Sequence, residues 1–244
     1  MLDTLQKKLI FRPKRLELDK PLNLSAPHEE FFLRDEKLGL NIHSVFMPAQ
    51  GLRKGLVLYY HGNSDNLQRW TQYAEDFTKR NHDILLIDYP GFGKSSGNPT
   101  EENVYHAAEL SYKWALERME AGEIVIYGRS IGTAPASFLA SKKACKQLVL
   151  ETPFYSLKDL FDHHPLYRFI DPVYSMPVHQ FLSEVQQPIS IFQGTKDRIV
   201  PFRSAARLKG VLKESDNFFV IPGGKHKDLG TFSSYQENLS YILE

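Results

Sequence analysis

The sequence has little cysteine, no long apolar run and almost no net charge. The single cysteine, Cys145, excludes an internal disulfide framework, and because it precedes an apolar run we expect a small buried side chain. No stretch is long and apolar enough to span a bilayer, and Lys7 and Lys8 interrupt the region where a signal peptide needs its apolar segment. The formal net charge of +1 gives no strong field for nucleic acid. We expect a cytoplasmic protein with no integral membrane segment and no nucleic-acid partner.

The bulk composition favours one globular domain. Hydrophobic residues make up 42% and charged residues 24% of the 244 residues, which is ordinary for a soluble globular protein that buries a full core. The chain shows no internal repeat, no low-complexity tract and no linker. We therefore expect residues 1–244 to form a single domain.

Apolar runs and amphipathic stretches alternate along the chain. Residues 30–34 and 40–46 have the pattern of two paired strands, after one or two amphipathic turns and an extended segment within 1–28. Further strands are expected at 55–60, 83–88, 123–127, 147–151, 188–193 and 217–221. Helices are expected at 67–80, 100–119, 133–140, 202–212 and 229–243. This alternation predicts an α/β protein with a mostly parallel central sheet and helices on both faces.

The stretch Gly128-Arg129-Ser130-Ile131-Gly132 carries the strongest chemical signal. It follows the strand expected at 123–127 and precedes a helix rich in small residues, which is the context of a nucleophile elbow. Such a turn strains the serine backbone, and the two glycines remove collisions on either side. G-x-S-x-G alone is a loose pattern, and the simpler interpretation is an ordinary Ser-Gly turn. We predict that Ser130 is a nucleophile and that the Ile131 amide stabilises a developing negative charge.

A serine nucleophile needs a base, and the base needs an acid that orients it. In open α/β sheets, functional loops gather at the carboxyl ends of the strands. Asp197 directly follows the strand 188–193, and His226 directly follows the strand 217–221. We therefore predict a Ser130, Asp197, His226 triad, in the chain order that this elbow requires. Glu151 also ends a strand and is the rival acid; its other interpretation is a hydrogen-bond anchor at the base of residues 155–187.

The loop after the strand 55–60 is expected to supply a second oxyanion donor. We predict that the donor is the backbone amide of Asn63, within one position, and that it acts together with the amide of Ile131. For His61 we favour a structural role, hydrogen-bonded to neighbouring loop carbonyls, over a catalytic one.

Residues 155–187 differ from the rest of the chain. They are interrupted by proline and rich in aromatic side chains, and their apolar residues do not recur with the spacing of a helix or a strand. This stretch is long for a loop and short for a cap domain. We expect a short lid that excludes water and binds an acyl chain of short to medium length.

Two further patterns are weak signals for a cofactor or a metal. Gly93-Lys94-Ser95 resembles part of a phosphate-binding loop, but Asp88 occupies the place of its first glycine. His163 and His164 are adjacent, and adjacent histidines chelate one metal poorly. We predict neither a cofactor site nor a metal site.

Five motifs together resemble the α/β-hydrolase superfamily over residues 30–243. They are HGNSDN at 61–66, DYPGFGKSSG at 88–97, GRSIG at 128–132, GTKDRIVP at 194–201 and GGKH at 223–226. The motifs HGN, ETPF and GTKD resemble those of the cap-poor, serine aminopeptidase-like branch of this superfamily. That branch includes bacterial esterases and eukaryotic membrane-anchored thioesterases that remove palmitoyl groups.

These observations predict an α/β-hydrolase fold and a serine hydrolase of carboxylic esters or thioesters with short to medium acyl chains. The expected partner is a small-molecule acyl substrate, and the mechanism needs no cofactor. A peptidase or amidase is the alternative enzyme, although no site for a substrate terminus is evident. A non-catalytic binding protein on the same scaffold is the alternative of another class, but such proteins usually lose a triad member.

Overall fold

The computed structural model describes the backbone of residues 2–244 and the side chains of residues 6–244. Its backbone contacts divide it into two compact units, one that ends at Val125 and one that begins at Ile126. From residue 64 onward strands alternate with helices, so the predicted α/β class is confirmed. The prediction of a single domain stays a prediction.

The first unit holds six strands and four α-helices among the described residues. The strands are β1 (Arg12–Pro13), β2 (Glu29–Asp35), β3 (Leu40–Met47), β4 (Gly55–Tyr60), β5 (Ser64–Asp65) and β6 (His82–Ile87). The helices are α1 (Leu2–Ile10), α2 (Leu67–Trp70), α3 (Glu75–Thr78) and α4 (Glu101–Leu116), with 3-10 turns η1 (Thr71–Tyr73) and η2 (Ala121–Glu123).

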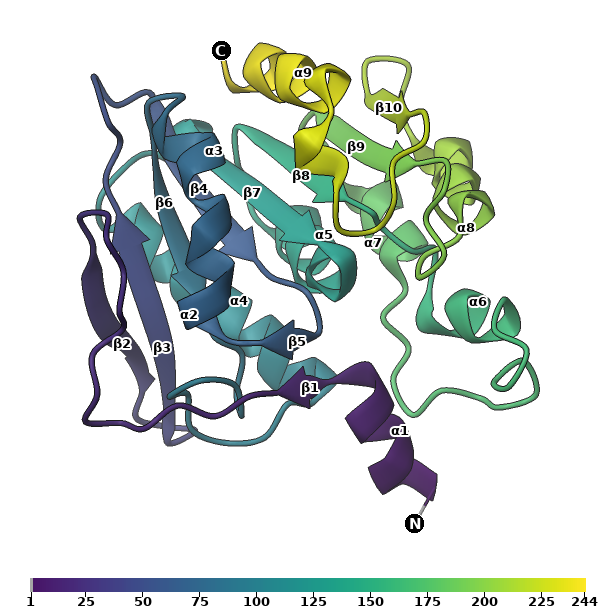
Figure 1. Cartoon of the computed structure of the whole chain (residues 1–244), viewed down its shortest axis with the longest axis horizontal. Helices are drawn as coiled ribbons and strands as arrows, with labels where there is room; N and C mark the ends of the chain where they lie inside the picture. The colour runs from purple at the N-terminus through teal and green to yellow at the C-terminus, as the bar shows by residue number, and fades with distance from the viewer. Residues whose placement is uncertain (1) are drawn as a thin grey trace. The chain divides into compact units, whose positions relative to one another are not determined.

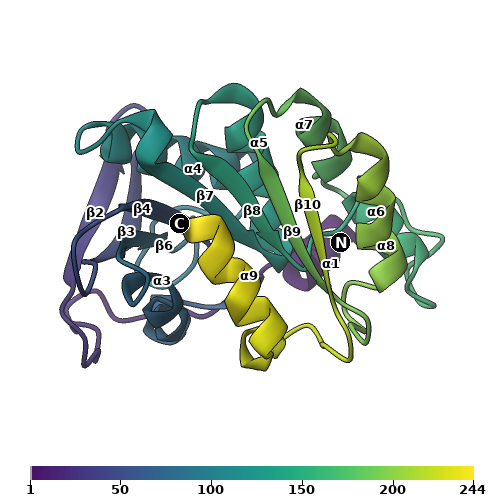
Figure 2. The same cartoon turned by 90° about the horizontal axis from the view of Figure 1, so that it is seen from above.

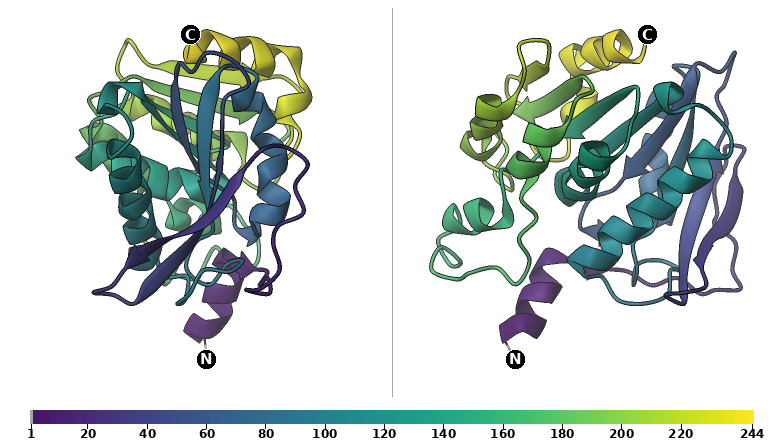
Figure 3. Two further views of the ribbon diagram at one scale, coloured as in Figure 1. Left: turned by 90° about the vertical axis from the view of Figure 1, so that its left-hand side faces the viewer. Right: turned by 180° about the vertical axis from the view of Figure 1, so that it is seen from behind.

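Four strands of the first unit follow one another in a sheet in the order β4, β6, β3, β2 (Figure 1). β4 and β6 are parallel, and the two remaining pairs are antiparallel, which includes the predicted pairing of 30–34 with 40–46. Every residue of β4 and β6 is buried, as a continuous apolar run predicts for strands covered on both faces. Helix α4 packs on one face, and α2 and α3 pack on the other (Figure 3).

The second unit holds the other strands and helices, together with β7, which begins at the boundary. The strands are β7 (Ile124–Arg129), β8 (Gln147–Glu151), β9 (Ile189–Gly194) and β10 (Asn217–Ile221). The α-helices are α5 (Thr133–Lys142), α6 (Leu157–Asp162), α7 (Val178–Glu184), α8 (Phe202–Arg207) and α9 (Ser233–Leu243). The 3-10 turns are η3 (Ser130–Gly132), η4 (Leu208–Val211) and η5 (Leu229–Thr231).

The strands of the second unit lie in the order β10, β9, β8, β7, and β9 is parallel to both of its neighbours. Helix α9 lies on one face of these strands, and α5 and α8 lie on the other (Figure 2). Because β8, β9 and β10 are parallel, the loops that leave these strands share one edge. The register pairs Gly194 with Ile221, so the two loops that follow these residues start side by side.

Some predicted elements are shorter than the sequence pattern suggested. The helix expected at 229–243 is η5 followed by α9, because Phe232 between them has an extended backbone (φ −93°, ψ 132°). The helix expected at 202–212 likewise continues as η4 after Arg207, and the one expected at 67–80 divides into α2, η1 and α3. Among the helices that the structure describes, none has the length and apolarity needed to cross a bilayer.

Candidate active site

The predicted elbow forms a tight turn between β7 and α5. Ser130 has a left-handed backbone (φ +56°), which a non-glycine residue adopts only at a cost. A Cβ atom at Gly128 would lie 2.5 Å from the carbonyl oxygen of Gly132 and 2.7 Å from Cβ of Ala136, so only glycine fits there. The turn therefore has the geometry that the G-x-S-x-G pattern predicts.

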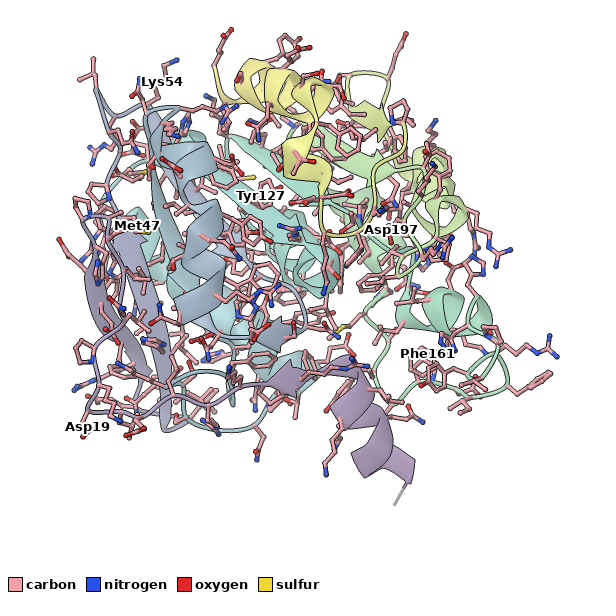
Figure 4. The ribbon with its side chains drawn as sticks, viewed as in Figure 1. Asp19, Met47, Lys54, Tyr127, Phe161 and Asp197 are labelled. Carbon is pink, nitrogen blue, oxygen red and sulfur yellow. The ribbon has the colours of Figure 1, made fainter. Side chains whose placement is uncertain are left out.

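Ser130, His226 and Asp197 come together within the second unit. Nε2 of His226 lies 2.9 Å from Oγ of Ser130, and Nδ1 lies 2.8 Å from Oδ2 of Asp197. Figure 4 labels Asp197 in the loop that follows β9. An ionised carboxylate can only accept a hydrogen bond, so Nδ1 carries a proton and donates it to Asp197. In the neutral ring Nε2 then accepts the hydrogen bond of the Ser130 hydroxyl, which is the orientation that a general base requires.

The loop after β9 fixes the Asp197 carboxylate firmly. Its Oδ1 accepts hydrogen bonds from the backbone amides of Ile199 (2.8 Å) and Val200 (2.9 Å), and its side chain is fully buried. A Cβ atom at Gly194 would lie 2.3 Å from the carbonyl oxygen of Gly224, so glycine allows the loops that carry the acid and the histidine to approach. The position of the acid is thus set by backbone contacts before His226 is considered.

Glu151, the rival acid, has other partners. Its Oε1 lies 3.2 Å from Nε of Arg129, and its Oε2 accepts a hydrogen bond of 2.7 Å from the Tyr127 hydroxyl. Both ring nitrogens of His226 are occupied by Asp197 and Ser130. The contacts therefore favour Asp197 as the acid and make Glu151 an anchor of the elbow strand.

The two predicted oxyanion donors lie in different units. Ile131 belongs to η3 at the start of α5, where first-turn amides lack intrahelical partners. Asn63 precedes β5, which pairs with β1, and its carbonyl oxygen accepts a hydrogen bond of 2.7 Å from the Arg12 amide. Nδ1 of His61 lies 2.7 Å from the carbonyl oxygen of Gly62, which is the loop contact predicted for it. That the amides of Asn63 and Ile131 act together stays a prediction.

Sequence reasoning missed a buried polar network in the first unit. His43 lies between two carboxylates, with Nδ1 2.9 Å from Asp88 and Nε2 2.9 Å from Glu30, and Lys94 pairs with Glu30. Burial would raise the pKa of Asp88, but its hydrogen bond with His43 and its attraction to the His61 ring, 3.5 Å away, outweigh burial and lower that pKa. Lys94 of the apparent phosphate-loop pattern thus has a structural partner. The signal that could have revealed this network was a histidine within one strand and an aspartate directly after another.

Residues 155–187 are held to α8 by a second cluster. Asp159 forms an ion pair with Arg207 and accepts a hydrogen bond from the Ser204 hydroxyl. The Arg207 guanidinium lies 3.9 Å from the ring centre of Tyr155, and Tyr155 stacks on His179 at 4.0 Å. These contacts fix both ends of the segment, which contains α6 and α7. Within the described residues, no group of three or more histidine, cysteine, aspartate or glutamate side chains is placed to hold a metal ion.

Comparison with known proteins adds sequence relatives. The family model "alpha/beta hydrolase fold" matches residues 55–176. The chain is 31% identical over 222 residues to "Alpha/beta hydrolase domain-containing protein 17C" of Xenopus tropicalis, which covers 88% of this chain and 69% of that protein. The chain is 29% identical over 217 residues to the human protein of the same name, and the aligned region covers 86% of this chain and 63% of that protein. The chain thus spans about two thirds of the length of these relatives.

Solved structures show the same fold. An esterase from Pyrococcus furiosus superposes with a TM-score of 0.76 at 17% identity, over 96% of each chain. An alpha-beta hydrolase from Vibrio vulnificus gives a TM-score of 0.77 at 17% identity, over 98% of this chain and 93% of that one. At this identity the likeness concerns the fold alone.

Proposed function

Since the chain belongs to the alpha/beta hydrolase family, we propose that it is a serine hydrolase that cleaves carboxylic esters or thioesters through an acyl-enzyme. The membership confirms the resemblance and the fold predicted from the motifs. The serine mechanism and the substrate are the parts that we propose.

The contact chain from Ser130 through His226 to Asp197 is the observation that carries the proposal. Three residues from three separate strand ends meet at hydrogen-bond distance, in the arrangement that activates a hydroxyl. A binding protein on this scaffold would have no need of that arrangement.

The reaction follows from these contacts. The Ser130 oxygen attacks the carbonyl carbon while its proton passes to Nε2 of His226, and Asp197 stabilises the imidazolium. The amides of Ile131 and Asn63 are the proposed donors to the oxyanion. His226 then protonates the departing alcohol or thiol. A water molecule, deprotonated by His226, then attacks the acyl-enzyme, and His226 returns the proton to the Ser130 oxygen as the acid leaves.

The substrate is proposed to carry a short or medium acyl chain, with residues 155–187 as a lid. The cluster of Asp159, Arg207 and Tyr155 ties the start of this segment to α8, which limits how far the segment can open. Between α6 and α7, Leu166 and Phe169 are largely exposed (76% and 85%), and we propose that this apolar surface contacts the acyl group.

A series of p-nitrophenyl esters from acetate to palmitate tests the proposal directly. We expect kcat/KM to peak at short or medium chains and to disappear in Ser130→Ala, whose circular dichroism should match that of the wild type. A specificity constant that rises through palmitate contradicts the lid argument but leaves the serine mechanism intact. Hydrolysis of aminoacyl amides but not of esters points to the peptidase alternative. Full activity of Ser130→Ala overturns the serine mechanism.

A further inference from the structure

Arg129 and Glu151 lie behind the elbow and have no part in the proton transfers proposed above. Arg129 directly precedes Ser130 at the end of β7, and Glu151 is the last residue of β8. Both side chains are almost completely buried, with 5% and 3% of their surface exposed. A buried pair of opposite charges is costly unless it is well bonded, so its presence beside a nucleophile calls for a reason.

The hydrogen bonds of Glu151 extend away from His226. One carboxylate oxygen faces Nε of Arg129 at 3.2 Å, and the other accepts the Tyr127 hydroxyl at 2.7 Å. The Tyr127 oxygen in turn lies 2.8 Å from the hydroxyl of Tyr235 on α9. Figure 4 labels Tyr127 on β7. Both carboxylate oxygens therefore have partners other than His226, and the contact with Arg129 connects Glu151 to the residue that directly precedes Ser130.

Each member of this pair is followed by a strained residue. Ser130 has a φ of +56° and Thr152 a φ of +50°, and a positive φ is a genuine outlier for a β-branched residue such as threonine. Thr152 is held to β9 by a hydrogen bond of 2.8 Å from its amide to the carbonyl oxygen of Phe192. Strained residues persist only where the surrounding contacts over-determine them. The ion pair joins the two strands at the point where both strained residues begin.

We propose that Arg129 and Glu151 are positioning residues that hold Ser130 in its strained conformation, with its hydroxyl within reach of His226. The inference rests on the proposed role of Ser130. A displacement of about 1 Å in a reacting group can cost about 100-fold in rate, so a modest relaxation of the elbow would be visible in kcat.

Glu151→Gln is the sharpest variant because it removes the charge and keeps the shape. The amide oxygen can face Arg129, and the amide N–H can donate to the Tyr127 oxygen, which can then turn its own proton to Tyr235. We expect kcat for p-nitrophenyl butyrate to fall by about 10- to 100-fold while KM changes little, because the loss falls on the transition state. The rate of fluorophosphonate labelling of Ser130 should fall by the same factor.

Asp216→Asn is the matched control. The Asp216 side chain is also fully buried, forms an ion pair with Lys213 (3.0 Å) and lies in the loop that precedes β10, at the end of the strands opposite to the elbow. Both variants should lose thermal stability, but only Glu151→Gln should lose kcat per titrated active site. If Glu151→Gln lowers only the melting temperature, the pair is merely structural and the proposal is overturned.

A double-mutant cycle tests whether the two residues act as one unit. Arg129→Met and Glu151→Gln should each lower kcat. The kcat of the double variant should be no lower than that of the less active single variant. Losses that multiply mean independent effects and contradict the proposal. A loss of about 10⁴ in Glu151→Gln alone, with an altered pH profile, would make Glu151 the triad acid and also overturn it.

Tyr127→Phe keeps the inference testable if these variants do not fold, since it removes only the hydroxyl that binds Glu151. Its kcat should fall severalfold, whereas Tyr235→Phe, which leaves the contacts of Glu151 in place, should keep the wild-type kcat. Equal kcat values for both tyrosine variants and the wild type refute the positioning role. A wild-type protein that hydrolyses no ester or thioester and takes up no fluorophosphonate instead refutes the proposed function itself.

Discussion

Replacement of Asp197 by asparagine should nearly abolish turnover, for a reason that the geometry makes specific. Oδ1 of Asp197 accepts hydrogen bonds from two backbone amides, those of Ile199 and Val200. In Asp197→Asn the amide oxygen must stay on that side, because an NH₂ group there would face two other donors. The NH₂ group then points to Nδ1 of His226, where Oδ2 lay at 2.8 Å.

This orientation reverses the tautomer of His226. Nδ1 has to accept a hydrogen bond, so the ring proton moves to Nε2 and faces Ser130, where it blocks proton abstraction. In other triads the same change costs about 10⁴ in kcat, or roughly 5.5 kcal/mol of transition-state stabilisation. The assay is p-nitrophenyl butyrate hydrolysis at pH 7–8 by purified enzyme. Asp216→Asn serves as control, since its buried carboxylate also accepts two backbone amides, those of Ile189 and Lys213.

A modest effect would refute this reasoning. If folded Asp197→Asn retains a tenth of the wild-type kcat, Asp197 does not set the tautomer of His226, and the acid must be sought elsewhere.

Three further predictions concern stability and reactivity. Gly128→Ala places a methyl group 2.5 Å from a backbone oxygen and should lower the free energy of unfolding by about 1–3 kcal/mol. Calorimetry should show a Tm that is lower by about 3 °C for each kcal/mol, and an unchanged Tm contradicts the tight elbow. Burial raises the pKa of Cys145 to about 12, so a thiol reagent at pH 8 should modify it only after denaturation. The pKa of Asp88 is lower in the folded protein than in the unfolded chain, where it is about 3.9. The ionised carboxylate therefore contributes its full stabilisation at a pH above the unfolded-state pKa, and this stabilisation is lost as the pH falls through the folded-state pKa. The Tm of the wild type should therefore drop more steeply below about pH 4 than that of Asp88→Asn, and equal slopes would count against the network.

The sequence predicts the strand ends well because local patterns determine them. The apolar runs before Ser130, Asp197 and His226 each end at a glycine or polar loop, and parallel strands bring such loops to one edge. The Gly194–Ile221 register then places the acid and histidine loops next to each other. No long-range information was needed beyond the assumption of a parallel sheet.

The partners of buried charges could not be predicted in the same way. Arg129 and Glu151 are 22 positions apart on different strands, and which charges meet depends on the strand order. A carboxylate at the end of an apolar strand does indicate that a partner must exist, because an unpaired buried charge is too costly. The short pairing of β1 with β5 also escaped prediction, since two-residue strands carry no periodic pattern.

The central claim is that Ser130 is the nucleophile, and the mass of the labelled protein tests it most directly. Intact wild-type protein treated with a fluorophosphonate should gain the mass of one phosphonyl group, and peptide mapping should place that group on Ser130. Ser130→Ala should gain none under the same conditions. Stoichiometric labelling of another residue, or of the alanine variant, would contradict the account.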